Sequence, residues 1–532
     1  MMNFLLEPFL PRLLPATLQL HNLCISDNPQ LVLGAAACLG VIVGAIAWAY
    51  LPKKKSGLPL PPSPPTWRLL GHMLPHRNTF LTVAGWIHKY GPVITIRLGY
   101  VNIVIIGRYK AAIDIMENQG KSLADRPRMV AAGEIFSGGL SIAFAPFGER
   151  FRCMRRALHT HLQPKAAEAY QPLQMSHAKN TVLDILDDPH NFENHVKTYA
   201  AAIIMKIAYG KNTPTSATDP EVIETNELFR MVGAIARPGA YLVDSIPWLK
   251  YLPWYGRDLR RGFERNMKLN AGHMNRVKEQ MQSNVDIGPS FAKYMLESGH
   301  LYGLSEAETA FLAGALFRAG SNTTSVALCT VFMAAACFPE EQAKVQAELD
   351  AVIGSHRAPT FADQSSLPRL QAFISEALRW RPMAPGGLAH QTNKEVIWEN
   401  YCIPAGTIVF GNHWSISRDP EVYPEPYAFK PQRWIDDQGR LRDDLKFFVY
   451  GFGRRVCPGQ HVADRSVFIN SLLILWSFRL ALDPTQPLDD MGYINDDIPE
   501  RPCAIEFEAR IPETELRRMM QDHPEVALHE KS

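Results

Sequence analysis

One cysteine stands in a loop of glycines and arginines directly ahead of an apolar run, and this feature constrains the fold most. Residues 450–466 read YGFGRRVCPGQHVADRS, and the mostly apolar VFINSLLILWSF follows. Glycine permits tight backbone turns, so Gly453 and Gly459 let the loop pass close to another group. The sequence therefore predicts that Cys457 is held at the entrance of a buried helix.

A cysteine thiolate serves as a nucleophile, a zinc ligand or a haem ligand. A nucleophile needs a base, and His461 lies close by, but nothing supplies an oxyanion hole. A zinc site needs three or four ligands, and no second cysteine is near. A haem ligand needs amide donors from the next helix and cations such as Arg455 for two propionates. Haem ligation fits best, with Tyr450 packing on the loop.

Composition limits the classes of protein to which this chain can belong. The chain has 532 residues, 46% of them hydrophobic, and a formal net charge of +2. This is enough apolar material for a large core, and the charge indicates no nucleic-acid partner. The eight cysteines are scattered without a CxxC pair. The pattern argues against a disulfide framework and indicates that the bulk of the chain faces the cytosol.

The N-terminal part predicts a membrane anchor. Residues 31–51 carry no charge, and about 20 apolar residues cross a bilayer. The lysines of PKKKSG follow at once, so the positive-inside rule places residues 1–30 in the lumen. Residues 52–66 are basic and rich in proline, which favours a stiff linker. A catalytic domain over residues 67–532 is expected beyond it.

The rest of the chain predicts a mainly α fold with a minor β portion. Two β-rich runs around Gly99 indicate a hairpin over residues 93–106. Residues 116–350 are mainly helical in pattern. Strand-like runs return at residues 395–410 and near 500–511. The β portion is therefore drawn from both ends of the sequence.

The cysteine loop resembles the haem-binding loop of the cytochrome P-450 family, Phe-x-x-Gly-x-Arg-x-Cys-x-Gly. Gly453, Arg455, Cys457 and Gly459 match that pattern, and Tyr450 stands where the family has Phe. The resemblance extends over nearly the whole chain after the linker. It implies a haem-thiolate fold, with haem b (iron protoporphyrin IX) as cofactor and Cys457 as the axial ligand of its iron.

The family also has a structural group of one acid and two arginines. Glu376 and Arg379 in EALR match its Glu-x-x-Arg pair, and Arg433 in PQRW matches the later arginine, with Trp434 in place of Phe. The resemblance implies a buried ion group that locks the core behind the haem. Removing one partner of such a pair typically costs about 3–5 kcal/mol.

Two further propionate partners follow from the resemblance. FGERFRCMRR is similar to the family's Trp-x-x-x-Arg helix, so Arg155 matches the arginine and Phe151 replaces the tryptophan. GLAHQT places His390 where relatives hold a propionate-binding histidine.

Residues 311–338 resemble the family's oxygen-side helix, in which an Ala/Gly-Gly-x-Asp/Glu-Thr-Thr/Ser turn serves catalysis. Gly320 and Thr323 match, whereas Asn322 replaces the acid that helps to relay protons in relatives. An amide forms hydrogen bonds but does not donate a proton as an acid does. We therefore expect an altered proton supply, with slower turnover or more peroxide leakage.

The resemblance implies a monooxygenase that inserts one atom of O2 into an apolar small molecule by hydroxylation or epoxidation. The layout is most similar to fungal microsomal members in terpenoid, polyketide or aromatic secondary metabolism. The chain has no GxGxxG after a strand, so electrons from NADPH are expected through a separate flavoprotein reductase. Arg152, Arg156 and Arg454 are candidates for its docking face, or are simply solvated. The expected location is the endoplasmic reticulum membrane, with a single pass and a cytosolic catalytic domain.

Two readings other than monooxygenation stay open. Asn322 keeps a haem-thiolate isomerase or dehydratase without an external reductase possible, and a non-enzymatic membrane protein that binds haem or sterol is the other. By family position, the substrate pocket is expected to include Phe144, Phe317, Met383 and Ala384.

Overall fold

The computed structural model describes residues 34, 37, 40, 41, 57–66, 71–75, 77–99, 101–283, 288–445, 448–492 and 503–521. The expected lumenal segment lies outside these residues, as does nearly all of the expected anchor. Among the described residues, no helix taken singly has the length and hydropathy of a membrane span, although helices α11 and α12, bent by 105° at their junction, pass together.

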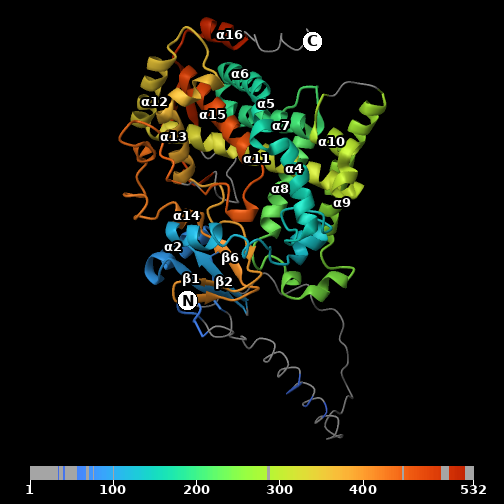
Figure 1. Cartoon of the computed structure of the whole chain (residues 1–532). Coiled ribbons are helices and arrows are strands. Elements are labelled where there is room, and N and C mark those ends of the chain that lie inside the picture. The colour runs from blue at the N-terminus through green and yellow to red at the C-terminus, as the bar shows by residue number, and fades with distance from the viewer. Residues whose placement is uncertain are drawn as a thin grey trace, which may run out of the picture. The chain divides into compact units, whose positions relative to one another are not determined.

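Helices make up most of the compact unit, which runs from Leu58 to Ser532. The principal helices, several of them labelled in Figure 1, are α2 (Thr79–Tyr90), α4 (Glu149–Leu162), α5 (Pro164–Ala169), α6 (Gln171–Asp187), α7 (Phe192–Tyr209), α8 (Pro220–Ile235), α9 (Arg257–Gln282), α10 (Phe291–Ser298), α11 (Glu306–Cys337), α12 (Pro339–Val352), α13 (Pro368–Trp380), α14 (His413–Ile416), α15 (Gln460–Ser477) and α16 (Glu513–Gln521).

The strands are short and form small sheets. They are β1 (Val93–Leu98), β2 (Val101–Ile106), β3 (His390–Gln391), β4 (Val396–Trp398), β5 (Tyr401–Ile403), β6 (Ile408–Gly411), β7 (Phe478–Leu482) and β8 (Ile505–Ala509). In the described residues β1-β2-β6-β3 form one sheet, β4-β5 a second and β7-β8 a third. The prediction of a mainly helical domain with a minor β portion is confirmed.

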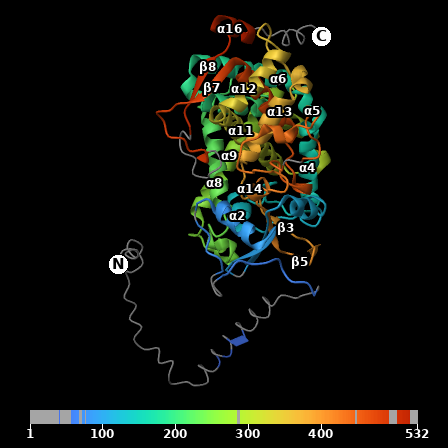
Figure 2. The ribbon, with the colours of Figure 1, turned by 90° about the vertical axis from the view of Figure 1, so that its left-hand side faces the viewer.

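The hairpin of β1 and β2 carries the largest sheet. Gly99 turns the chain at φ 57°, a conformation that glycine adopts at little cost. Val93 then pairs with Ile106 in antiparallel register, and β2 runs parallel to β6. The sheet β1-β2-β6-β3 thus joins segments from both ends of the sequence, and Figures 1 and 2 show it at the end of the compact unit where α2 lies.

Helix α11 is the central helix of the unit. Its start is fixed by a capping box, in which the Ser305 hydroxyl accepts from the Glu308 amide and the Glu308 carboxylate accepts from the Ser305 amide. Nearly every side chain from Thr309 to Ala336 is buried, as expected for a helix that is apolar all round. It packs against α7, α9 and α15.

The proline-rich run is attached to the sheets. The amide and hydroxyl of Thr95 donate to the carbonyls of Pro62 and Pro61 at 2.7 and 2.8 Å, and the Cys402 amide donates to Pro59 at 2.9 Å. Proline keeps its carbonyl acceptor although it lacks an N–H donor. The compact unit therefore begins at Leu58, earlier than the expected Trp67.

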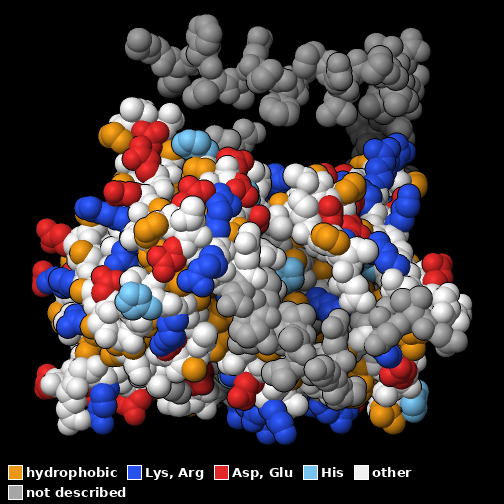
Figure 3. Space-filling model, turned by 90° about the horizontal axis from the view of Figure 1, so that it is seen from above, with side chains coloured by type: hydrophobic (Ala, Val, Ile, Leu, Met, Phe, Trp, Pro, Cys, Tyr) orange, Lys and Arg blue, Asp and Glu red, His pale blue; other side chains and the backbone are white. Residues whose placement is uncertain are grey.

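The face seen from above in Figure 3 carries lysine and arginine side chains interspersed with aspartate and glutamate. Hydrophobic side chains stand between them. This mixture accords with a formal net charge of only +2.

Candidate active site

The cysteine loop meets helix α15 at the sulfur of Cys457. The Cys457 amide donates to the carbonyl of Tyr450 at 2.8 Å, which closes the loop. Burial raises the pKa of the Cys457 thiol, whereas hydrogen bonds from the amides of Gly459 and Gln460 and the charge of Arg155 lower it. The first amides of α15 therefore point at the sulfur and stabilise its anionic form.

Of the two loop glycines, Gly453 is required on steric grounds. Gly453 has φ 52°, and a Cβ there would lie 2.8 Å from the carbonyl oxygen of Met116. A Cβ on Gly459 would lie 3.9 Å from the Cys457 sulfur, in ordinary contact. Gly453 is therefore required for the close approach of two backbone segments, and Gly459 leaves space beside the sulfur.

Arg155, Arg455 and His390 lie around this loop. Arg155 on α4 donates to the carbonyl of Val456 at 2.8 Å. Arg455 donates to two other main-chain carbonyls at 2.7 and 2.6 Å, and its guanidinium stacks 3.7 Å from the ring centre of Phe151. Phe151 thus supplies an aromatic face to the arginine where relatives have an indole.

His390 is buried on β3 and shares a hydrogen bond of 2.9 Å between its Nδ1 and the carbonyl of Leu123. Burial, together with the charges of Arg126 and Arg455, lowers the pKa of His390 to about 3. The histidine is therefore neutral in this environment, because burial and the neighbouring cations both disfavour its charged form.

The sequence did not reveal a further member of this cluster, Arg126. Its side chain donates to the carbonyls of Ala389 and Ala143, and burial lowers its pKa to about 10. The same charge lowers the pKa of Arg455, after burial as the larger cause. The available signal was the segment ADRPRM, in which one arginine follows an acid and precedes a proline.

Asp125 is the acid next to this cluster, and its charge raises the pKa of Arg455. Its Oδ1 is already taken by the amides of Arg126 and Phe147, at 2.9 and 2.8 Å. Asp125 thus acts on Arg455, while the side chains of Arg126 and Arg155 donate to main-chain carbonyls. Buried cations need an anionic partner, and the two carboxylates of a haem supply that charge. The residues present fit a haem with Cys457 as its ligand.

On the oxygen-side helix, Ala319 and Thr323 are exposed although the residues around them in α11 are mostly buried. The Thr323 hydroxyl donates to the Ala319 carbonyl at 2.9 Å, so the helix stays continuous through this turn. A Cβ on Gly320 would lie 2.6 Å from Ile204, which makes this glycine the contact point of α7. Asn322 is half-buried, and its carbonyl accepts from Ser325 at 2.7 Å.

The acid and two arginines predicted as a structural group do meet. Glu376 accepts two bonds of 2.7 Å from Arg379, and both side chains are fully buried. Arg433 donates to the same carboxylate at 3.1 Å, and the Trp434 indole N–H donates to it at 2.9 Å. The tryptophan that replaces the family's phenylalanine therefore adds a donor to the group.

The pocket prediction is wrong for Phe317. This ring is 1% exposed and packs edge-on against Tyr209 of α7 and His273 of α9. It belongs to the core because it lies on the face of α11 turned away from Ala319 and Thr323. Phe144, Met383 and Ala384 are half-buried and stay candidates.

A half-buried cysteine at the start of a core helix, with helix amides facing its sulfur and half-buried arginines around it, is the arrangement of a haem-thiolate protein. The comparisons with known proteins agree. The chain belongs to the cytochrome P-450 family, whose sequence model matches residues 61–493.

Relatives in fungi are substantially similar. Cytochrome P-450 monooxygenase 64 of Postia placenta is 48% identical over 457 residues, which cover 86% of this chain and 92% of the relative. Cytochrome P-450 monooxygenase 113 of the same fungus is 45% identical over 90% of this chain and 97% of its own length. A cytochrome P-450 monooxygenase of Armillaria gallica is 34% identical over 85% and 89%. The chain is accordingly an oxidoreductase of the monooxygenase type.

Proposed function

We propose that this chain hydroxylates or epoxidises an apolar small molecule in fungal secondary metabolism, with electrons from NADPH through a separate flavoprotein reductase. One observation carries the proposal: the amides of Gly459 and Gln460 point at the sulfur of Cys457, where they favour its anionic form, beside Arg155 and Arg455. When bound there, a haem supplies the oxygen and one-electron chemistry.

The chain's own residues orient the cofactor and manage protons. Arg126, Arg155 and Arg455 would hold the two carboxylates, since each already points donors at main-chain carbonyls in this region. Thr323 presents its hydroxyl on the open side of α11. Asn322 supplies an amide where relatives have an acid, so it orients a hydrogen bond without releasing a proton.

The first experiment is a carbon monoxide difference spectrum of the reduced protein lacking residues 1–52. A strongly red-shifted Soret band that is lost in Cys457→Ser supports thiolate-ligated haem. A band like that of a histidine-ligated protein, or no haem at all, overturns the proposal.

A second experiment separates monooxygenation from rearrangement without a reductase, the alternative that Asn322 keeps open. Product is expected only when NADPH and a fungal flavoprotein reductase are both present. Product formed equally well without them would establish the isomerase or dehydratase reading instead.

The Asn322 turn gives a matched test of proton supply. Asn322→Asp restores an acid, and we expect more product and less hydrogen peroxide per NADPH consumed. Asn322→Ser, which adds no acid, is the control. Equal product and peroxide yields in both variants and the natural protein would remove the proton-supply idea.

We also propose that the chain is anchored in the endoplasmic reticulum membrane with its catalytic domain in the cytosol. The uncharged residues 31–51 and the lysines after them support this. An exposed apolar segment between α8 and α9 gives independent support, because such patches mark membrane or partner contacts. Its exposed side chains are Leu242, Ile246, Trp248, Tyr251 and Trp254.

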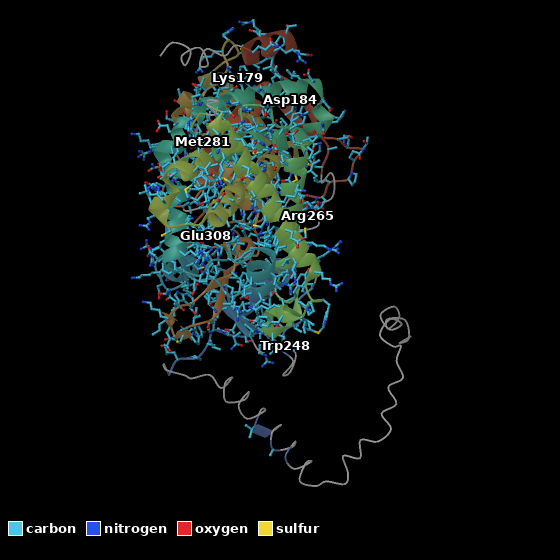
Figure 4. All side chains as sticks on the ribbon, turned by 90° about the vertical axis from the view of Figure 1, so that its right-hand side faces the viewer. Lys179, Asp184, Trp248, Arg265, Met281 and Glu308 are labelled. Carbon is cyan, nitrogen blue, oxygen red and sulfur yellow. The ribbon has the colours of Figure 1, made fainter. Side chains whose placement is uncertain are left out.

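Figure 4 places Trp248 at the same end of the compact unit as the sheet of β1 and β2 in Figure 1. Tryptophan and tyrosine favour the membrane–water interface. Flotation with liposomes tests this: the protein lacking residues 1–52 should bind, and Trp248→Ser with Trp254→Ser should bind less. If the double variant bound liposomes as well as the shortened protein does, the proposed membrane contact of this segment would be wrong.

For the reductase, Arg454 is exposed, whereas Arg152 and Arg156 both pair with Glu149 at 2.8 and 3.3 Å. The pairing halves the net positive charge that the latter two offer, so Arg454 is the better candidate for docking. Arg454→Glu should slow the transfer of electrons from the reductase, and the slowing should vanish at high salt.

A further inference from the structure

The phenol of Tyr450 joins the cysteine loop to helix α15. The main-chain carbonyl of Tyr450 accepts from the Cys457 amide at 2.8 Å, and the phenol hydroxyl donates to Oδ1 of Asp464 at 2.6 Å. Asp464 lies on α15 beyond the residues whose amides point at the sulfur. A single residue therefore contacts the backbone of the ligand residue through its main chain and the helix behind it through its side chain.

This contact has a geometric consequence. The amides of Gly459 and Gln460 stabilise the sulfur only while the start of α15 keeps its place against the loop. A hydrogen bond from a hydroxyl to a carboxylate is short and among the stronger kinds. The 2.6 Å bond between Tyr450 and Asp464 fixes that relation. A phenylalanine at this position has no such bond.

The contact also has an electrostatic consequence. Asp464 lies on the second turn of α15, the helix whose first amides face the sulfur, so its negative charge is held on the element that supports Cys457. A negative charge held there repels an electron added to a metal that the sulfur binds. His461 and Arg465 flank Asp464 on the same helix.

We propose that Tyr450 and Asp464 form a brace, a pair of positioning residues that keeps the cysteine loop seated on α15 and lowers the reduction potential of the iron that Cys457 holds. This inference rests on the proposed haem ligation. It assigns the hydroxyl of Tyr450, which stands where the family has phenylalanine, a task that the ring alone does not perform.

Two variants separate the two parts of the brace. Tyr450→Phe removes the hydroxyl and keeps the Asp464 charge. Asp464→Asn removes the charge and keeps an oxygen that accepts from the phenol. Asp437→Asn, which neutralises an exposed acid in the turn after Trp434, is the matched control.

The experiment measures the midpoint potential and the stability of the red-shifted carbonyl band in the full holoenzyme. Asp464→Asn is expected to shift the reduction equilibrium by about tenfold toward the ferrous form, which is about 59 mV for one electron. Asp437→Asn should leave the potential unchanged. In Tyr450→Phe the red-shifted band should decay severalfold faster in mild urea, since the loop is no longer tied to α15.

The outcomes distinguish this inference from the function on which it rests. If the natural protein lacks the red-shifted band, the haem-thiolate proposal itself fails. If that band is present but Asp464→Asn has the potential of Asp437→Asn, the electrostatic part of the brace is wrong. A band in Tyr450→Phe as durable as that of the natural protein overturns the geometric part.

Discussion

Two arginine-rich regions of this protein treat buried charge in opposite ways. At Glu376, one carboxylate receives donors from Arg379, Arg433 and the indole of Trp434, so both arginines pair directly with an acid of the protein. Around Cys457, the hydrogen bonds of the arginine side chains go to main-chain carbonyls. The first region is complete, because both arginines pair with a carboxylate of the protein. The second is incomplete, because its arginine side chains bond to neutral carbonyls and their charge is available to an anionic ligand.

The largest expected effect comes from breaking the complete region. Glu376→Gln leaves two buried guanidinium groups without their carboxylate, and the free energy of unfolding should fall by about 3–5 kcal/mol. Urea denaturation and soluble yield measure it. Glu425→Gln is the control, since Glu425 pairs with Lys430 at the surface and such pairs contribute about 0–1 kcal/mol. Equal urea midpoints for the two variants would contradict a buried ion group.

The incomplete region should respond differently. Arg455→Gln removes a cation whose pKa burial lowers to about 9, so the haem-free protein should lose little stability. Haem affinity should fall about tenfold or more, because a charge-assisted hydrogen bond contributes about 1.5–3 kcal/mol. The rate of haem transfer to an apo-globin measures the affinity. Arg454→Gln, at the exposed neighbour, should retain haem normally; equal retention in both variants would count against the cluster.

A smaller effect should appear in the pH dependence of stability. In the haem-free protein, burial holds the pKa of His390 at about 3, below about 6.5 in the unfolded chain. Between these values the unfolded state binds a proton that the native state does not. Stability should therefore be intact above about pH 6.5 and fall below it, by at most about 1.4 kcal/mol per pH unit.

His390→Gln should make this fall shallower between pH 6.5 and 5, and urea midpoints across that range measure it. His413, whose pKa burial lowers to about 4, contributes a similar slope in both proteins. Haem carboxylates beside His390 should raise its pKa, so the two proteins should converge once haem is bound. Parallel curves in the haem-free state would show that His390 is not held neutral.

The sequence predicted the helical fold and the parts of the site that depend on local pattern. Cys457 with its two glycines could be recognised because the loop and its helix are contiguous. Glu376 and Arg379 could be recognised because a spacing of three residues puts both on one face of a helix. Arg433 was reached only through the resemblance.

Long-range packing was beyond the sequence. Arg126 is recognisable only once its segment lies against β3, where Asp125 bridges to Gln391. The side of α11 that carries Phe317 depends on where α7 and α9 pack. The hydroxyl of Tyr450 needed a partner, but nothing in the pattern pointed to Asp464 rather than to another polar group. Each of these depends on tertiary contacts between distant segments.

The hydrogen bonds between the proline-rich run and the sheets decide where the chain can be shortened without loss of stability. A shortened protein that began at Trp67 would leave the Thr95 amide, its hydroxyl and the Cys402 amide without their acceptors. Each buried donor left unpaired costs about 1–3 kcal/mol, and the total rivals the whole stability of an ordinary domain. A cut placed before Leu58 spares all of them, so a shortened version of this enzyme should keep Pro59, Pro61 and Pro62.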